Sequence, residues 1–336
     1  MRVRSASPAR SCWLRSASLL SSVLFLFAAA CVGQSVDPKL PDYKTAGGVS
    51  GKLDTVGSDT MNGLAQLWTE EFKKYYPGVS AAVDAKGSSN AIPALINGSA
   101  NFGPMSRDAK KSEITEFNKK FGYDPVMLPT SIDMMAVYVN RNNPIEGLSF
   151  PEIDAIFSST RKGGAKSQST SWDALGVKGQ LTGKKILCYG RNAASGTYGY
   201  FKEKVLKDGD FGNWVTENAG SSAVVQAVGA NVAGIGYSGI GVATPNVKAI
   251  KIAIEQGGDL IAPTAENAYS GDYPLARLLY LSVNYDPRKP LDPLRAEFIR
   301  FVFSKQGQLQ VAKDGYLPLD AESAAAALAM VGLKGN

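Results

Sequence analysis

Apolar residues along the chain switch repeatedly between the spacing of a strand and the spacing of a helix. The run KLDTVG, which begins at Lys52, is typical of a strand, and residues 60–78 then place apolar side chains three or four positions apart until Pro77 and Gly78 end the helix. A strand-like run, VSAAVDA, and a short helix, SSNAIPALING, follow. This order of strand, turn and helix predicts an α/β domain with a largely parallel sheet.

The same rhythm continues through the rest of the chain. MMAVYVN, KILCYG, AGIGYSG and ARLLYLSVN are predicted strands, and SGTYGYFKEKVL, SSAVVQAVGAN and DPLRAEFIRFVFS are predicted helices. Ser149 and Glu152 stand three positions apart at the start of SFPEIDAIFSS, which is the spacing of a capping box at a helix N-terminus. At 336 residues, the chain is long enough for two such domains.

The first thirty residues are predicted to form a signal peptide. Four arginines precede the apolar run LLSSVLFLFAAAC, which is short for a membrane span and typical of a secretory leader. AAAC also resembles a bacterial lipoprotein cleavage site with Cys31 as the acylated residue, although Ala28 stands where such sites usually have Leu. A plain secretory cut near Ala30 and an organelle presequence are the alternatives. Residues 31–50 have many turn formers and are predicted to be a flexible tether.

The composition restricts the chemistry that the chain can perform. It contains no histidine, so most acid–base and metal chemistry is not expected, and we predict neither a metal nor a cofactor. The four arginines of the leader account for four units of the net charge of +6, so a nucleic-acid partner is not implied. Cys12 lies in the leader and lipidation would use Cys31. Cys188 is then a lone thiol in an apolar run, where a buried small side chain is the expected role.

Four turns share one kind of chemistry. They are GSDTM (57–61), KGSSN (86–90), GPMSRD (103–108) and RNAASGT (191–197), and each precedes a predicted or expected helix. A helix N-terminus carries unpaired amides and a partial positive charge, so it favours anions. Glycine lets the backbone approach closely, serine and threonine add short donors, and arginine adds a fork of donors that suits an oxyanion.

Each turn has an ordinary explanation when it is considered alone. A serine or threonine before a helix is usually an N-cap, and a single arginine such as Arg191 is more often a surface cation. The recurrence of the pattern matters more, because in a parallel sheet such turns gather at the carboxyl ends of the strands, where ligands bind. If the turns of two lobes face one another, their donors converge on one small cleft.

The order and spacing of these motifs, together with GIGYSG, resemble the substrate-binding protein of the bacterial high-affinity phosphate ABC transporter over about residues 52–316. The resemblance implies a two-lobed periplasmic-binding-protein fold of class II type, in which each lobe is a mostly parallel sheet flanked by helices and crossing strands join the lobes. We expect residues 52–133 and 273–336 in lobe I and residues 134–272 in lobe II. By motif, the implied phosphate-binding residues are Thr60, Met61, Ser88, Ser106, Arg191, Ser195, Gly196 and Thr197, with Ser58 and Ser89 of the same turns as further candidates.

One departure from the family pattern concerns the proton of hydrogen phosphate. Well-known members carry an aspartate at the position of Ser106, and that aspartate accepts the proton, which sulfate lacks. This chain has Ser106 and Arg107 instead, so Arg107 is expected to be a second cation on the anion, or otherwise an exposed charge at the rim. Asp59, Asp108 and Asp133 are the candidates for the missing acceptor. We favour Asp133, because SIDMMAVYVN would bring it to the end of a strand near the lobe crossing.

The resemblance implies a function in transport. We expect a monomer that binds inorganic phosphate and delivers it to the permease subunits of an ABC transporter, in the bacterial periplasm or cell envelope, with a lipid anchor at Cys31. Sulfate, arsenate and molybdate are alternative ligands, and a phosphate sensor or a structural envelope protein is an alternative role. A hydrolase with Ser195 as nucleophile is disfavoured, because the chain has no histidine to activate the hydroxyl and no G-x-S-x-G at that position.

Overall fold

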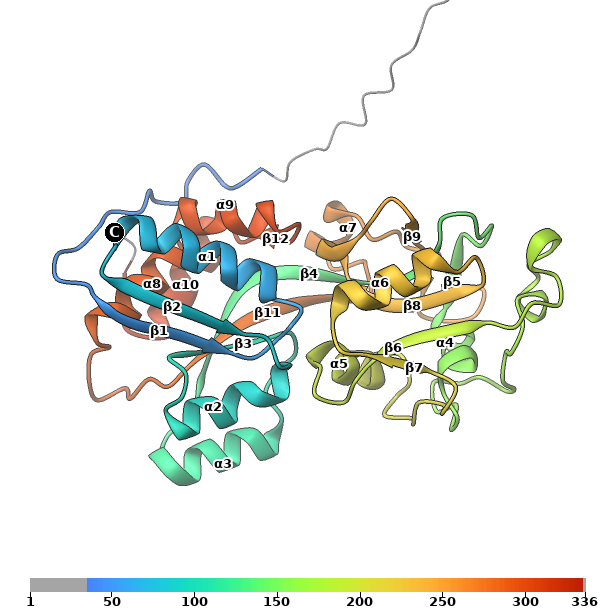
Figure 1. Cartoon of the computed structure of the whole chain (residues 1–336), viewed down its shortest axis with the longest axis horizontal. Helices are drawn as coiled ribbons and strands as arrows, with labels where there is room; N and C mark the ends of the chain where they lie inside the picture. Colours follow the sequence, from blue (N-terminus) through green and yellow to red (C-terminus); the bar gives the residue numbers. More distant parts are fainter. Residues whose placement is uncertain (1–34, 335–336) are drawn as a thin grey trace, which may run out of the picture. The chain divides into compact units, whose positions relative to one another are not determined.

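A long strand, β4 (Val126–Asn140), belongs to the sheets of both lobes. Its first half pairs with β11 (Ala276–Val283) and its second half pairs with β8 (Gly234–Gly239), in each case antiparallel (Figure 1). The structure, a computed structural model, describes residues 35–334, which belong to one compact unit. The predicted signal peptide (1–30) and the lipidation site Cys31 lie outside the described residues.

The first lobe is built on three parallel strands in the order β2–β1–β3, and β11 joins them antiparallel at β3. Its buried centre includes Leu53, Trp68, Phe72 and Phe298. The strands are β1 (Gly51–Val56), β2 (Val79–Asp84), β3 (Phe102–Met105) and the short β12 (Leu317–Pro318). The helices are α1 (Asn62–Tyr75), α2 (Ala91–Asn97), α3 (Lys111–Phe121), α8 (Pro293–Val302), α9 (Lys305–Lys313) and α10 (Ala321–Ala329), with a 3₁₀ turn at Ser88–Asn90.

The second lobe repeats the arrangement with the parallel strands β8–β6–β7, and β4 joins them antiparallel at β8. Its core includes Phe157, Trp172, Phe201 and Tyr237, and the last two rings stack with their centroids 3.9 Å apart. The remaining strands are β5 (Gly147–Ser149), β6 (Leu187–Arg191), β7 (Thr216–Asn218), β9 (Val247–Ala249) and β10 (Lys251–Ala253). The helices are α4 (Phe150–Phe157), α5 (Gly196–Lys204), α6 (Ser221–Ala230) and α7 (Ala265–Tyr269), with 3₁₀ turns at Asp173–Leu175, Gly179–Leu181 and Ile240–Val242.

The predicted rhythm of strands and helices is confirmed, with differences in detail. The capping box of α4 is present, since Ser149 N–H donates to Glu152 Oε2 at 2.8 Å and Glu152 N–H donates to Ser149 Oγ at 3.4 Å. The sheet is mixed, because the crossing strands run antiparallel to the parallel triplet of each lobe. Residues 102–105 form strand β3, although the sequence placed most of them in a turn. The exact lobe boundaries stay a prediction. Within residues 35–334, no helix is both long enough and apolar enough to cross a bilayer.

The segment before β1 is not the free tether that the sequence predicts, as far as residues 35–50 are concerned. Leu40, Tyr43 and Val49 are buried against the first lobe. The Tyr43 hydroxyl donates to Glu297 Oε2 at 3.0 Å, and Lys305 N–H donates to the Pro41 carbonyl at 2.9 Å. The physical reason is that a few well-placed apolar side chains suffice to hold an irregular segment on a core, without any periodicity that the sequence would reveal.

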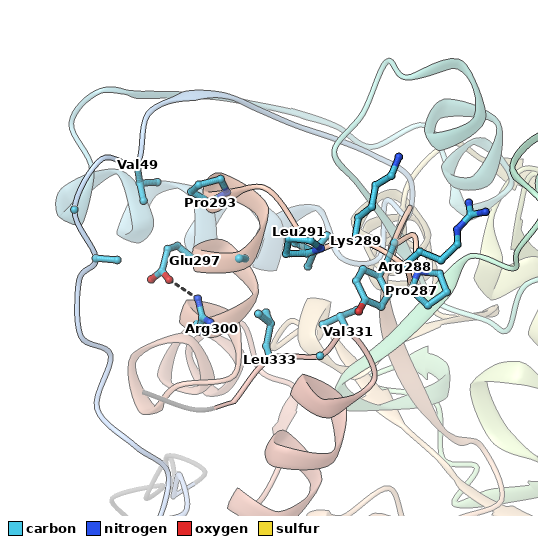
Figure 2. Close-up of a pocket in the computed structure, with 16 residues that line it drawn as sticks. Val49, Pro287, Arg288, Lys289, Leu291, Pro293, Glu297, Arg300, Val331 and Leu333 are labelled. Carbon is cyan, nitrogen blue, oxygen red and sulfur yellow. Dashed lines mark hydrogen bonds and ion pairs between the residues drawn. The ribbon is translucent and has the colours of Figure 1, made fainter.

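A cavity of about 580 Å³ lies between this segment, the loop before α8 and the end of the chain. Figure 2 shows Val49, Pro293 and Leu333 along it, with Glu297 paired to Arg300. Its lining contains none of the predicted anion-binding residues, so this cavity is separate from the site described below.

Asp314, which follows α9, supports the first turn of α1 and provides a stability test. Its half-buried carboxylate accepts from the Leu64 amide, and burial raises its pKa to about 7. The unfolded chain therefore loses this proton near pH 4 while the folded protein keeps it until about pH 7, so the folded state loses stability as the pH rises between these values. An asparagine keeps the acceptor but cannot ionise.

Replacing Asp314 by asparagine is expected to stabilise the protein at pH 8 by about 1–2 kcal/mol, a rise in Tm of roughly 2–6 °C, because the side chain remains partly solvated. At pH 4 the variant and the wild type should melt together. Thermal melts at the two pH values measure the difference. A gain of equal size at both would show that ionisation of Asp314 is not its source.

Candidate anion-binding site

The four turns singled out by the sequence meet at the carboxyl ends of the parallel strands, between the two lobes. Ser58 N–H donates to the Pro104 carbonyl at 2.7 Å, which joins the first turn to the third. Gly87 N–H donates to the Gly57 carbonyl at 2.7 Å, and Ser89 N–H donates to the Ala194 carbonyl at 3.1 Å. The last of these bonds connects a turn of the first lobe to the turn before α5 in the second.

Hydroxyl groups from both lobes lie within hydrogen-bonding distance in this region. Thr60 Oγ1 lies 2.9 Å from Thr197 Oγ1, and Ser88 Oγ lies 3.3 Å from Ser106 Oγ. Gly196 faces the same two serines, because a Cβ added to it would lie 2.5 Å from Ser106 Oγ and closer still to Ser88 Oγ. All four hydroxyl groups are buried. The structure therefore brings together Thr60, Ser88, Ser106, Gly196 and Thr197.

The direction of one hydrogen bond leaves a donor available. Ser106 N–H donates to Ser88 Oγ at 3.1 Å, so the Ser88 oxygen already accepts a hydrogen. Its own hydrogen can then be given to Ser106 Oγ or to an anion placed among these groups.

Ser195 caps α5, since its Oγ accepts from Tyr198 N–H at 3.4 Å. Met61 stands at the N-cap position of α1, and both residues are buried beside the turns that hold Thr60 and Gly196.

Arg191 is a buried cation beside these hydroxyl groups, with a side chain only 1% exposed. Its Nη2 lies 2.5 Å from Asp59 Oδ1, and its Nη1 donates to Ser221 Oγ at 2.8 Å. The Nε atom is buried and has no hydrogen-bond partner within the described part of the chain. A buried donor without a partner costs free energy, so this unpaired N–H marks a place where an acceptor is missing.

The carboxylate that meets Arg191 is Asp59, which the sequence offered only as an alternative. Asp59 Oδ2 also accepts from the Ser221 amide and hydroxyl, both at 3.1 Å. Ser221 begins α6, so a third helix N-terminus, beside those of α1 and α5, points into the same region. Ser221 was not predicted as a site residue. The only signal was SS at the start of a predicted helix, which is also the ordinary composition of an N-cap.

Asp133 does not offer a free carboxylate to this cluster, contrary to our preference from the sequence. Its Oδ2 accepts from Arg277 Nε and Nη2 at 3.0 and 2.7 Å, and its Oδ1 accepts from Ile240 N–H at 3.1 Å. The reason is register: Asp133 on β4 stands directly opposite Arg277 on β11. Arg277 was missed, although a lone cation at the start of the apolar run ARLLYLSVN could have indicated it.

Arg107 is also held away from the hydroxyl cluster. Its two terminal nitrogens form an ion pair with Glu113 of α3, at 2.7 and 2.9 Å, and bond Ser89 Oγ and the Asp108 carbonyl. The helix α3, which was expected after this turn but whose residues were not predicted, supplies the carboxylate that pairs with it. Ser58 is buried in the first turn, and its Oγ has no partner within residues 35–334.

The arrangement is suited to holding a small oxyanion. Buried hydroxyls, helix N-termini and an arginine with an unpaired N–H converge between two lobes, and each can donate to an oxygen atom. A cavity of about 470 Å³ that is lined by Asp59, Thr60 and Ser221 adjoins them. Fold and site together define a two-lobed solute-binding protein of the periplasmic type.

Comparison with known proteins supports this class of protein and identifies the family within it. The model of the PBP superfamily domain matches residues 43–306. The chain is 47% identical over 318 residues to the phosphate-binding protein PstS of Pseudomonas aeruginosa strain PAO1, which covers 94% of this chain and 98% of that protein. The chain belongs to the PstS family of phosphate-binding proteins.

More distant relatives extend the same picture. Protein SphX of Synechococcus elongatus is 29% identical over 276 residues, 81% of this chain and 78% of that protein. The crystal structure of an ABC-type phosphate transport receptor from Vibrio cholerae superposes with a TM-score of 0.62 at 24% identity, covering 80% of this chain and all of that one. This structural likeness supports the two-lobed fold.

Proposed function

We propose that this chain is the substrate-binding component of a phosphate ABC transporter. It binds inorganic phosphate between its lobes and delivers the ion to a membrane permease. The observation that carries the proposal is the buried Arg191, which has an unpaired Nε and bonds through Nη1 to Ser221 Oγ, itself 3.5 Å from Thr60 Oγ1 of the other lobe. The phosphate-binding residues of this proposal are Thr60, Met61, Ser88, Ser106, Arg191, Ser195, Gly196 and Thr197.

The number of donors accounts for tight binding. Hydrogen bonds to a charged group contribute roughly 1.5–3 kcal/mol each. A submicromolar dissociation constant requires more than about 8 kcal/mol. The summed contribution of eight such donors exceeds this free energy, even after the costs of desolvation and of ordering two lobes around one ion are subtracted.

Asp59 is the acceptor that we propose for the proton of hydrogen phosphate. Its Oδ1 pairs with Arg191 but has no hydrogen-bond partner of good geometry within the described residues, whereas both oxygens of Asp133 accept hydrogen bonds, from Arg277 and from Ile240. Asp59 also contacts Ser221 at the first turn of α6. Sulfate has no proton to give and would oppose its oxygen to this carboxylate. A carboxylate and a sulfate oxygen that face each other without a proton between them repel, and losing the hydrogen bond that phosphate makes there costs at least about 1–3 kcal/mol, which disfavours sulfate.

Lobe closure connects binding to transport. Phosphate contacts both lobes and so favours their closed arrangement, which the permease would recognise. The protein acts as a monomer in the periplasm, where acylation at Cys31 anchors it to the membrane, and it performs no catalysis. Arsenate has the shape and protonation of phosphate and is expected to compete with it.

Isothermal titration of the mature protein with phosphate, sulfate and arsenate tests the function. Phosphate should bind one to one with a dissociation constant below about 1 μM, and sulfate at least tenfold more weakly. Millimolar phosphate should also raise the melting temperature. A chain that neither releases heat nor gains stability with phosphate would be a structural envelope protein or bind another solute.

Adding a methyl group at Gly196 tests whether the two lobes meet at this residue. In Gly196→Ala the new Cβ would overlap Ser88 Oγ and Ser106 Oγ, so the turns must separate and the affinity for phosphate should fall about 10- to 100-fold. Gly199→Ala, on the same helix, meets only the flexible Arg107 side chain at 3.2 Å and serves as the control. Equal affinities of the two variants would contradict the placement of Gly196.

A further inference from the structure

The strands that cross between the lobes carry a buried ion pair, Arg277 with Asp133, whose role is not explained by direct contact with the anion. Arg277 on β11 and Asp133 on β4 are cross-strand neighbours, and their side chains are 2% and 0% exposed. Arg277 donates to Asp133 Oδ2 through both Nε and Nη2. Such a pair is costly to desolvate and adds little net stability compared with apolar residues. Holding the two strands together therefore does not by itself explain its presence.

The remaining donors of Arg277 reach one group in each lobe. Nη1 donates to the Ser106 carbonyl at 2.7 Å, at the end of β3 in the first lobe. Nη2 donates to Thr197 Oγ1 at 2.9 Å, on α5 in the second lobe. Tyr200 of α5 covers the guanidinium, with its ring centroid 5.3 Å from Cζ. A single planar group in the hinge is therefore bonded to two residues of the proposed phosphate site, from opposite lobes.

The direction of the bond to Thr197 decides what that hydroxyl can do. A guanidinium only donates, so Thr197 Oγ1 must accept from Arg277. The single hydrogen of Thr197 is then left to point elsewhere, toward Thr60 Oγ1 at 2.9 Å or toward an anion between the two threonines. Arg277 thus fixes Thr197 as a donor, which is the role an oxyanion requires.

We propose that Arg277, held by Asp133, is a positioning residue for phosphate. It orients the Thr197 hydroxyl as a donor and ties Thr197 to Ser106 in the closed arrangement of the lobes. This inference rests on the proposed function, in which Thr197 and Ser106 contact phosphate. Opening the hinge would separate the two contacts, so Arg277 slows the release of phosphate.

Lysine at this position is the informative substitution. Arg277→Lys keeps the charge opposite Asp133, but one ammonium group cannot reach Asp133, the Ser106 carbonyl and Thr197 with the geometry of a planar fork. We expect the phosphate dissociation constant to rise about 10- to 100-fold, mainly through faster dissociation, with the circular dichroism spectrum unchanged. Arg288→Lys, an exposed arginine that pairs with Asp286, is the control and should bind like the wild type.

A double-mutant cycle with Thr197→Val separates positioning from general destabilisation. Once the hydroxyl is absent, Arg277 has lost its target, so Arg277→Lys should weaken phosphate binding by less than about threefold in the Thr197→Val background. Stopped-flow dissociation rates and titrations of the four proteins provide the comparison. The proposal is overturned if the fold-increases in dissociation constant of the two single variants multiply in the double variant, or if Arg277→Lys binds phosphate like the wild type. A wild type that does not bind phosphate overturns the proposed function instead.

If Arg277→Lys does not fold, Arg277→Met combined with Asp133→Leu takes its place. Replacing both members of a buried ion pair by apolar side chains is often tolerated, because no uncompensated charge remains. This variant should fold, bind phosphate about 10- to 100-fold more weakly and lose most of its sensitivity to Thr197→Val. Full affinity in the folded double variant would contradict the role of Arg277.

Discussion

Replacing Arg191 by glutamine is expected to weaken phosphate binding by about a thousandfold or more. The side chain is 1% exposed and supplies charge-assisted donors at roughly 1.5–3 kcal/mol each, so the loss of two of them costs about 4 kcal/mol. The substitution also leaves Asp59 buried with a negative charge that repels the anion. Titration calorimetry, or competition with a labelled phosphate reporter for the weakest binders, measures the change.

Two matched variants make this result interpretable. Arg288→Gln removes the same charge from an exposed site and should leave the affinity within about twofold of the wild type, since surface pairs contribute little. Arg191→Gln combined with Asp59→Asn removes both charges and should recover folding stability without recovering phosphate binding. An Arg191→Gln protein that binds within tenfold of the wild type would place the anion elsewhere.

Local sequence was sufficient to predict most of the fold and the turns that meet between the lobes. Thr60, Ser88 and Gly196 stand in turns whose glycine and hydroxyl content is tied to the start of the next helix, so each could be identified from its own neighbours. Their convergence followed from the parallel arrangement of the strands, and the structure places their side chains or backbone within one cluster.

Pairings between distant residues could not be predicted in the same way. Arg277 meets Asp133 only through the register of β11 on β4, and Arg107 meets Glu113 only because α3 folds back on the preceding turn. Residues 35–50 pack on the first lobe through isolated apolar contacts, without periodicity. In each case the partner is chosen by tertiary geometry, which outweighs what the local composition suggests.

Replacing Asp59 by asparagine is expected to remove most of the preference for phosphate over sulfate. Asparagine can turn its amide toward a sulfate oxygen, and Arg191 then keeps a positive charge that no carboxylate offsets. We expect sulfate to bind more tightly and phosphate more weakly, so that the ratio of the two dissociation constants shifts by about 10- to 100-fold, equivalent to about 1.4–2.7 kcal/mol.

Asp133→Asn is the matched comparison, because it makes the same chemical change in a more deeply buried aspartate, whose two oxygens both accept hydrogen bonds, from Arg277 or Ile240. The loss of its charge leaves Arg277 uncompensated and should lower the melting temperature, while the phosphate-to-sulfate ratio stays within about threefold of the wild type. Titrations of both variants with both anions therefore assign the proton acceptor. A ratio that changes in Asp133→Asn and not in Asp59→Asn would return that role to Asp133, since discrimination must follow the carboxylate that faces the anion.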